Sequence, residues 1–317
     1  MRVFAWLLLV LTPCTAAELL ELKRIWDQAA HNAFTDLVRW RGRWYCAFRE
    51  GQGHVSPDGA LRVLSSRDAA RWAAAALITS KDSDLRDPKL AITPDNRLML
   101  TTAGALHPPS AVRHVSMVWF SRDGRSWSGP ERIGEDNFWL WRVVCQRGSA
   151  YSVGYHTVEP LFTRLYHSRD GRRFEIHVEK LFEEGYPNES AIVFQPDGTA
   201  LCLLRRDRGP ATAQLGSARP PYREWTWKDL GVRMGGPQAL RLKDGRIVVA
   251  TRLYDGKVRT SLGWLDAAAG KFTEFLALPS GGDTSYPGLV MHQGLLHVSY
   301  YSTHEGKTSI YLAKVRL

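Results

Sequence analysis

The chain has 317 residues, of which 44% are hydrophobic, 11% aromatic and 23% charged, and its formal net charge is +10. This length and composition exclude a disordered chain and allow one large β domain, or two smaller ones, with a sizeable core. The basic residues are scattered along the sequence, which argues against a nucleic-acid interface. The positive charge is compatible with an acidic glycan as partner, and equally with a merely basic exported protein.

The first 17 residues have the pattern of a signal peptide. Arg2 precedes an apolar run from Val3 to Leu11, and the small residues at 15–17 fit a cleavage site. The run is too short to cross a bilayer as a helix. We therefore expect residues 1–17 to be removed and residues 18–317 to form one secreted or periplasmic domain, monomeric and not inserted in a membrane.

Three cysteines remain after this leader: Cys46, Cys145 and Cys202. Each lies in an apolar, strand-like stretch, and an odd number in such surroundings indicates buried free thiols rather than a disulfide framework. No cysteine–histidine pair has the spacing of a zinc site, so we expect neither a metal nor a cofactor.

Turn signals recur between strand-like runs along the whole chain. They are Arg41-Gly42, Asp95-Asn96, Arg147-Gly148, Asp197-Gly198, Asp244-Gly245 and Gln293-Gly294. Such pairs between alternating apolar runs are a strong hairpin signal, and their period of about 50 residues predicts six similar units. Helical periodicity is almost absent, although the Ala-rich stretch 69–76 could form a helical turn. We expect an all-β, six-bladed β-propeller with four-stranded blades.

A second motif occurs three times. SRDGRSW (121–127) and SRDGRRF (168–174) are near-copies, and SSRDAARW (65–72) is a degenerate third copy. The aspartate can bond turn amides, the glycine favours a positive φ, and the aromatic residue can pack into a blade. The motif resembles the Asp box of sialidases, one residue shorter. In sialidases this box marks the outer hairpin of propeller blades, so the resemblance also implies a six-bladed propeller.

Three arginines occupy equivalent places in this repeat. Arg49, Arg205 and Arg252 each follow the glycine of their turn by seven residues. Equivalent positions in a propeller are related by rotation about its axis, so these side chains could face one channel. Converging guanidinium groups would repel one another unless they surround an anion, such as a carboxylate that they grip with paired hydrogen bonds. The alternative is that they are strand-end arginines that point to water.

The strand before each turn supplies a second set of polar residues. The set comprises Asp36, Arg86, Asp87, Trp141, Arg142, Glu189, Gln238 and Tyr286. Innermost strands line the channel of a propeller, so these side chains are expected to face a common pocket. The set is rich in carboxylates, which are costly to bury without partners. Of these residues, Asp36, Arg86 and Gln238 are predicted to bind substrate.

The second half of the chain resembles exo-α-sialidases (neuraminidases) more specifically. Sialidases carry a glutamate, an arginine, a further arginine and a late tyrosine, and this order is reproduced by Glu189, Arg205, Arg252 and Tyr286. The resemblance implies that Tyr286 is the nucleophile and Glu189 its base. It also implies that the arginines bind the carboxylate of the substrate.

The first half departs from the sialidase pattern. Sialidases have Arg-Ile-Pro in the first strand, where this chain has HNAFTDL, and we expect Arg49 to substitute for the missing arginine. The acid/base aspartate of sialidases lies on a loop between this strand and the first Asp box. Asp58 is the first candidate for that role and Asp87 the second.

Together these features predict an exported exo-glycosidase that hydrolyses a terminal acidic sugar, with sialic acid as the first candidate, from a sialylated or other acidic glycan. The mechanism would be retaining, with a tyrosine nucleophile, because the carboxylate of the sugar would repel an anionic nucleophile. Two alternatives remain open. One is a carboxylate-only glycoside hydrolase that uses Asp36, Asp87 and Glu189 on another sugar. The other is a non-catalytic glycan-binding propeller.

Overall fold

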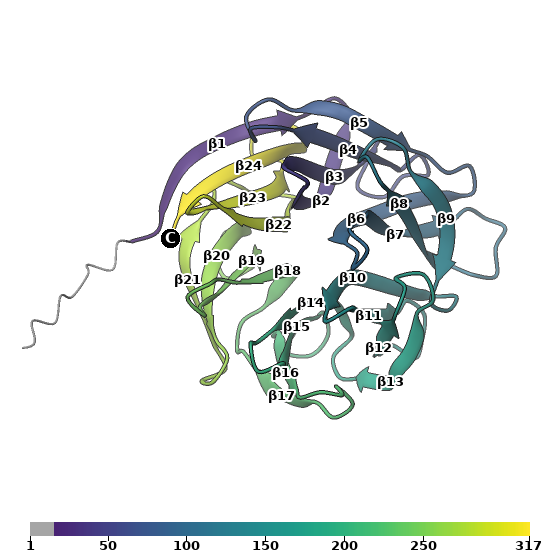
Figure 1. Cartoon of the computed structure of the whole chain (residues 1–317), viewed down its shortest axis with the longest axis vertical. Coiled ribbons are helices and arrows are strands. Elements are labelled where there is room, and N and C mark those ends of the chain that lie inside the picture. The colour runs from purple at the N-terminus through teal and green to yellow at the C-terminus, as the bar shows by residue number, and fades with distance from the viewer. Residues whose placement is uncertain (1–15) are drawn as a thin grey trace, which may run out of the picture.

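The computed structural model describes residues 16–317, and in this range it consists of β-strands and their connections (Figure 1). Six four-stranded antiparallel sheets surround a central axis. The predicted six-bladed β-propeller is thereby confirmed. The predicted leader, residues 1–17, lies almost entirely outside the described residues. Within them, no helix is long and apolar enough to cross a membrane.

In the first five blades the strands follow chain order from the axis outwards. Blade 1 contains β2 (His31–Trp40), β3 (Arg43–Gly51), β4 (Ala60–Ser66) and β5 (Ala73–Ile78), and blade 2 contains β6 (Ser83–Ile92), β7 (Leu98–Leu106), β8 (His114–Ser121) and β9 (Ser128–Ile133). Blade 3 contains β10 (Phe138–Gln146), β11 (Ser149–His156), β12 (Thr163–Ser168) and β13 (Glu175–Phe182). Blade 4 contains β14 (Pro187–Phe194), β15 (Ala200–Arg206), β16 (Gln214–Ala218) and β17 (Thr226–Asp229), and blade 5 contains β18 (Met234–Arg241), β19 (Ile247–Leu253), β20 (Arg259–Asp266) and β21 (Lys271–Ala277).

The sixth blade closes the ring with strands from both ends of the described chain. It contains β22 (Thr284–His292), β23 (Leu295–Ser302), β24 (Ser309–Arg316) and, as its outer strand, β1 (Glu18–Trp26). In Figure 1 the purple β1 lies beside the yellow β24, with which it pairs antiparallel. Because one sheet holds both ends, the first and last blades meet without an open gap in the ring.

The six predicted turns each connect the first and second strands of a blade, as expected for hairpins. The Ala-rich stretch is not helical, because residues 73–78 form β5, which pairs with β4. Pairing at the sheet edge therefore overrides the helix propensity of alanine. The three cysteines are free, as predicted; Cys46 and Cys202 are buried and Cys145 is half-buried.

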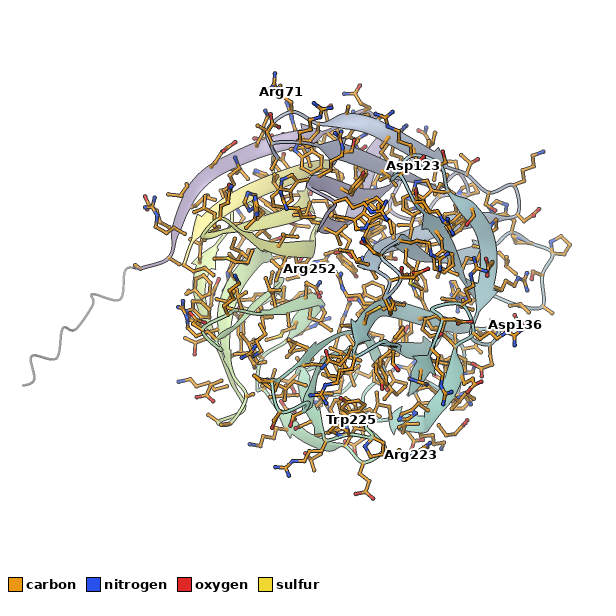
Figure 2. The ribbon with its side chains drawn as sticks, in the orientation of Figure 1. Arg71, Asp123, Asp136, Arg223, Trp225 and Arg252 are labelled. Carbon is orange, nitrogen blue, oxygen red and sulfur yellow. The ribbon has the colours of Figure 1, made fainter. Side chains whose placement is uncertain are left out.

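The three SRD-containing turns connect the third and fourth strands of blades 1, 2 and 3. In blade 2, the Asp123 carboxylate accepts hydrogen bonds of 2.8 Å from the amides of both Arg125 and Ser126. These amide bonds lower the pKa of Asp123 to about 2. Asp170 and Asp68 accept the equivalent pairs of amide bonds in their own turns. The turns of blades 1 and 2 lie away from the axis, as the labels of Arg71 and Asp123 show in Figure 2.

All six innermost strands are irregular at the same level. Their pairing registers shift between Ala33 and Asp36, Arg86 and Lys89, Leu140 and Val143, Pro187 and Ser190, Gly235 and Gln238, and Ser285 and Gly288. A bulge bends a strand and redirects a side chain, and bulges are common beside active sites. Phe34, Asp87, Gly236 and Tyr286 lie in these bulges at positive φ. The irregularities thus form one ring of redirected residues around the axis.

Candidate active site

The centre of this ring contains a tyrosine–glutamate pair. The Tyr286 hydroxyl on β22 donates a hydrogen bond to Glu189 Oε1 on β14. The two residues are 97 positions apart in the sequence, and each is 7% exposed. The propeller therefore brings together the two residues that were assigned as nucleophile and base.

Glu189 is held as a carboxylate. Its second oxygen, Oε2, accepts hydrogen bonds of 2.7 Å from Arg205 Nη1 and from the amide of Gly236. Burial of Glu189 opposes ionisation, but the Arg205 charge and the hydrogen bonds from Tyr286, Arg205 and Gly236 outweigh burial and lower its pKa. A carboxylate in this state can accept a proton from the phenol.

Tyr286 is neutral at rest. Its burial and the adjacent Glu189 carboxylate raise the pKa of Tyr286 well above its usual value, against the opposing charges of Arg205 and Arg252. Arg205 Nη1 also donates a 3.1 Å hydrogen bond to the phenolic oxygen. A phenolate that forms during a reaction would therefore have a cation beside it, which is the arrangement expected of an activated nucleophile.

Arg205 and Arg252 both reach this centre, and Figure 2 shows Arg252 close to the axis. Arg205 is oriented by Asp207, whose carboxylate lies 3.0 Å from Nη2. Arg252 donates to the Thr284 carbonyl from Nε at 2.7 Å and to the Tyr301 hydroxyl from Nη2 at 2.9 Å. Its guanidinium carbon is 5.3 Å from the centroid of the Tyr286 ring.

The predicted role of Arg49 in substrate binding is wrong. Arg49 is 0% exposed, and its Nε donates to Asp84 Oδ1 at 2.8 Å. Its other nitrogens donate to the carbonyls of Gly53 and Ser56 at 2.7 and 3.0 Å. A substrate cannot reach this guanidinium, which instead holds the loop between β3 and β4 in place.

Arg86 supplies a third cation near the centre. Its guanidinium carbon lies 5.7 Å from the Phe34 ring and 5.9 Å from the Trp139 ring. The Phe34 ring is in turn 5.3 Å from that of Tyr286. Within residues 16–317 its guanidinium makes no hydrogen bond, and its shortest ion-pair distance is 4.0 Å, to Asp84. Of Arg86, Arg205 and Arg252, Arg86 is therefore the one with the most donors left for a ligand.

The two aspartates proposed as the acid/base differ sharply in environment. Asp87 is buried, and burial raises its pKa. The charges of Lys89 and Arg86 act to lower this pKa, and the charge of Glu189 acts to raise it. Asp58 is exposed on the β3–β4 loop, and its pKa is lowered, mainly by a hydrogen bond from Ser56. A general acid must hold its proton near the working pH, so the structure favours Asp87 over the first choice, Asp58.

Neither Asp36 nor Gln238 hydrogen-bonds to Tyr286 or Glu189 among the described residues. Asp36 accepts hydrogen bonds from Arg142 Nη1 at 2.9 Å and from the amide of Leu90 at 2.8 Å. Both residues line a separate cavity of about 130 Å³, whose lining does not include Tyr286 or Glu189. Their contact with substrate stays a prediction, and Asp36 is unavailable for a carboxylate-only site because Arg142 and backbone amides occupy its oxygens.

Sequence reasoning missed several groups around the centre. Asp207, directly after the end of β15, orients Arg205, and Lys89 lies buried with its ammonium 5.6 Å from the Tyr286 ring. The signal for the bulges was visible, because Pro88, Pro237 and Pro287 each follow a bulge residue. Proline inside an innermost strand is a sign of a bulge.

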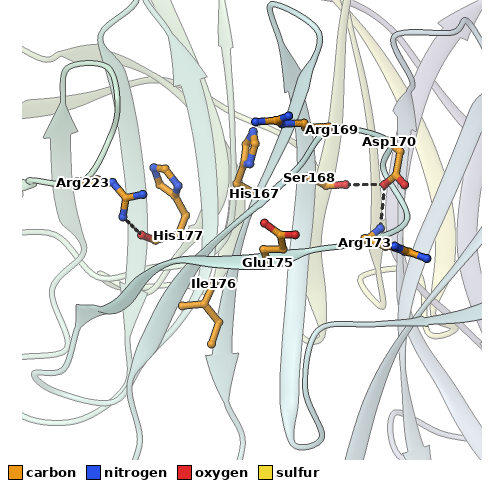
Figure 3. Close-up of a pocket in the computed structure, with 9 residues that line it drawn as sticks. All are labelled: His167, Ser168, Arg169, Asp170, Arg173, Glu175, Ile176, His177 and Arg223. Carbon is orange, nitrogen blue, oxygen red and sulfur yellow. Dashed lines mark hydrogen bonds between the residues drawn. The ribbon is translucent and has the colours of Figure 1, made fainter.

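A larger surface cavity of about 640 Å³ lies at the outer edge of blades 3 and 4, bounded by His167, Arg169, Glu175, His177 and Arg223 (Figure 3). Asp170 at its edge is committed to the turn amides described above. The Tyr286–Glu189 pair and its arginines lie at the axis of the propeller, and none of them lines this outer cavity. We therefore place the candidate active site at the axis.

The sequence matches no protein-family model and no curated protein. A protein of unknown function from Dyadobacter fermentans DSM 18053 has the same fold, with a TM-score of 0.83 and 21% identity over 95% of this chain and 99% of that chain. An α-L-arabinanase of Penicillium chrysogenum matches with a TM-score of 0.72 and 13% identity, over 93% of this chain and 98% of that chain. A Trypanosoma rangeli sialidase matches with a TM-score of 0.69 and 13% identity, over 90% of this chain and 55% of the longer sialidase chain. These identities establish the fold alone.

Proposed function

We propose that this protein is a retaining exo-glycosidase that removes a terminal acidic sugar, with sialic acid as the first candidate. The observation that carries the proposal is the Tyr286–Glu189 hydrogen bond beside Arg205 and Arg252. Most retaining glycosidases use two carboxylates, and sialidases are the exception that uses a tyrosine nucleophile. A sialidase and an arabinanase share the fold, so the choice between sugars rests on the chemistry of the site.

In the proposed first step, Glu189 takes the phenolic proton while the Tyr286 oxygen attacks the anomeric carbon. The bond to the leaving oxygen breaks as Asp87 donates a proton to it. In the second step, Asp87 removes a proton from water, which attacks the same carbon and displaces Tyr286, and Glu189 returns the proton to the phenol. Proton transfers of this kind contribute about 10²–10⁴-fold each.

The free donors of the arginines support an anionic substrate. Among the described residues, Arg252 Nη1 has no hydrogen-bond partner, and neither does the guanidinium of Arg86. The Arg252 guanidinium lies beside the Tyr286 ring. The Arg86 guanidinium lies beside the Phe34 ring, which packs against Tyr286. Two guanidinium groups with unused N–H donors are suited to bind the carboxylate that a sialic acid carries on its anomeric carbon.

A panel of fluorogenic glycosides tests the substrate. We expect purified protein to hydrolyse a sialoside and to leave an α-L-arabinofuranoside and neutral hexosides uncleaved. Cleavage of only a neutral glycoside would overturn the acidic-sugar assignment while leaving a glycosidase. Saturable binding of a sialylated oligosaccharide with no turnover would instead indicate a glycan-binding propeller.

Arg86 has a direct test. Arg86→Met is expected to lower kcat/KM for the sialoside by about 10- to 100-fold, mainly through KM, because it removes a charge-assisted hydrogen bond worth about 1.5–3 kcal/mol. Arg71→Met serves as the control, since the Arg71 side chain is 92% exposed at the periphery (Figure 2). Equal kinetics in the two variants would remove Arg86 from the binding site.

The pH dependence tests the roles of the two acids. Because the pKa of Asp87 is raised and Asp87 must be protonated, kcat should fall as pH rises through that pKa. Because the pKa of Glu189 is lowered and Glu189 must be ionised, the acid limb should lie below the usual range of glutamate. Asp87→Asn should abolish the alkaline limb and slow substrates with poor leaving groups most. Asp58→Asn should leave the profile unchanged, and the reverse result would restore Asp58 as the acid/base.

A further inference from the structure

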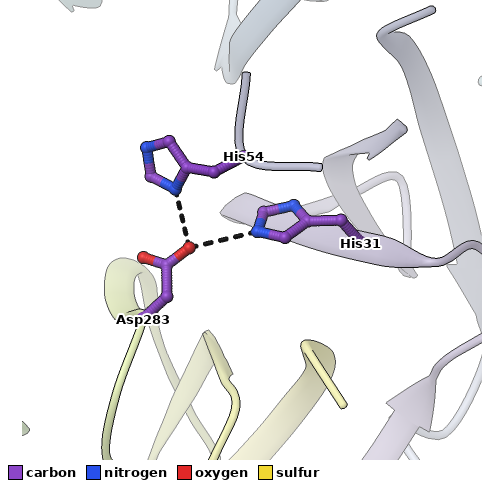
Figure 4. Close-up of side chains that lie close together, drawn as sticks. All are labelled: His31, His54 and Asp283. Carbon is purple, nitrogen blue, oxygen red and sulfur yellow. Dashed lines mark hydrogen bonds and ion pairs between the residues drawn. The ribbon is translucent and has the colours of Figure 1, made fainter. Parts of the chain in front are cut away.

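Three side chains outside the proposed reaction converge on one point (Figure 4), beside Phe34 and Arg252 of the candidate active site. His31 begins β2, His54 lies on the β3–β4 loop, and Asp283 directly precedes β22. His31 Nε2 and His54 Nδ1 lie 3.1 and 2.7 Å from the same oxygen, Asp283 Oδ2. All three atoms lie within 4.8 Å of one another. Blades 1 and 6 therefore present two nitrogens and one carboxylate oxygen to a single point.

We propose that His31, His54 and Asp283 bind a divalent transition-metal ion, with zinc as the best match. Two imidazoles and one carboxylate form a donor set suited to zinc, and three protein ligands leave a fourth position for water or a ligand. This differs from the expectation of no metal, which considered only cysteine–histidine spacing. Histidines that are distant in sequence and adjacent only in the fold cannot be recognised in that way.

The geometry requires only a small adjustment. Zinc ligands at about 2.0–2.2 Å in a tetrahedron stand roughly 3.3–3.5 Å from one another. The nitrogen–oxygen distances of 3.1 and 2.7 Å would therefore open by a few tenths of an ångström for His31 and somewhat more for His54. His54 can supply this movement, because its side chain is 47% exposed on a loop.

Asp283 is oriented as a metal ligand usually is. Its other oxygen, Oδ1, accepts a 2.7 Å hydrogen bond from the Tyr301 hydroxyl and lies 3.4 Å from Arg252 Nη2. Its backbone amide donates to Thr303 Oγ1 at 3.0 Å. Such outer contacts fix the direction in which a ligating carboxylate points. They leave Oδ2 directed at the two histidines.

The position of the metal would couple it to the active site. The His54 ring lies 5.0 Å from the Phe34 ring, which packs against Tyr286. A bound ion would tie the β3–β4 loop to the start of β22 and compete with Arg252 for the charge of Asp283. Removal of the ion is therefore expected to loosen this loop, which Arg49 anchors from its other side.

Zinc titration of the untagged full chain, after chelator treatment, tests the proposal without any substrate. Calorimetry and metal analysis should show one zinc ion per chain, and zinc should raise the melting temperature. His54→Ala should weaken binding by more than about tenfold. His177→Ala is the matched control, because His177 lies on the outer strand β13, and its affinity should equal that of the wild type.

Asp283→Asn gives a second variant that keeps the shape of the side chain and removes its charge. It should also lose zinc affinity by more than about tenfold, and circular dichroism would verify that both variants fold. The absence of saturable zinc binding by the wild type would overturn the proposal. Wild-type affinity in His54→Ala would do the same. Neither result would affect the glycosidase assignment, which depends on Tyr286 and Glu189.

Discussion

Tyr286→Phe is expected to lower kcat for the sialoside by more than about 10³-fold, because the variant lacks the oxygen that attacks the anomeric carbon. The fold should be unaffected. The ring remains to pack against Phe34 and Trp141, and Glu189 keeps its bonds to Arg205 and Gly236. Steady-state and single-turnover kinetics on a fluorogenic sialoside would measure the loss.

Two further variants make this result interpretable. Glu189→Gln should cause a loss of similar order, because an amide keeps the shape of the side chain and cannot accept the phenolic proton. Tyr300→Phe is the matched control: Tyr300 is a buried tyrosine whose hydroxyl bonds only the Pro279 carbonyl among the described residues. Near-wild-type turnover by Tyr286→Phe would show that another group attacks the sugar.

Arg49→Met is expected to produce the largest loss of stability, about 3–5 kcal/mol in the free energy of unfolding. The substitution leaves Asp84, whose side chain is 6% exposed, without its hydrogen-bonded cation. It also removes the Arg49 donor from the Ser56 carbonyl and leaves the Gly53 carbonyl with only the Ser56 hydroxyl, at 3.3 Å. Burial already raises the pKa of Asp84 against the effect of Arg49. Without Arg49 that pKa should rise further, so the loss of stability should be smaller in acid, where Asp84 is protonated.

Denaturant unfolding of a double-mutant cycle tests this explanation. Arg49→Met combined with Asp84→Leu should recover part of the lost stability, because the double variant no longer buries an unpaired charge. A change below about 0.5 kcal/mol in Arg49→Met, the range of ordinary surface substitutions, would show that the Arg49–Asp84 pair does not hold this part of the propeller.

The blades were predictable because their determinants are local. Each inner hairpin depends on a two-residue turn and flanking apolar residues, and these recur with one period along the chain. Strand β1 carries no such turn, and its partner β24 lies at the opposite end of the sequence. Closure of the ring is a property of the whole chain, so local patterns did not reveal it.

The site was predictable only in part. The repeat placed Arg205 and Arg252 at equivalent positions, and both reach the axis. Arg49 shares their position in the repeat, yet its guanidinium donates a hydrogen bond to Asp84 of the neighbouring blade and does not reach the axis. An equivalent backbone position fixes only the base of a side chain. Contacts with residues distant in the sequence determine where its guanidinium group lies. The same reason separates Asp87, which a bulge directs inward, from Asp58 on its exposed loop.

The proposed chemistry is tested most directly by covalent trapping. A fluorinated sialosyl fluoride slows hydrolysis of the glycosyl-enzyme, so peptide mass spectrometry of the treated protein can locate the attachment. We predict one fluorosialosyl group per chain, attached to Tyr286 and absent from Tyr286→Phe. Attachment to a carboxylate such as Asp87, or no attachment together with no cleavage of any sialoside, would contradict the account.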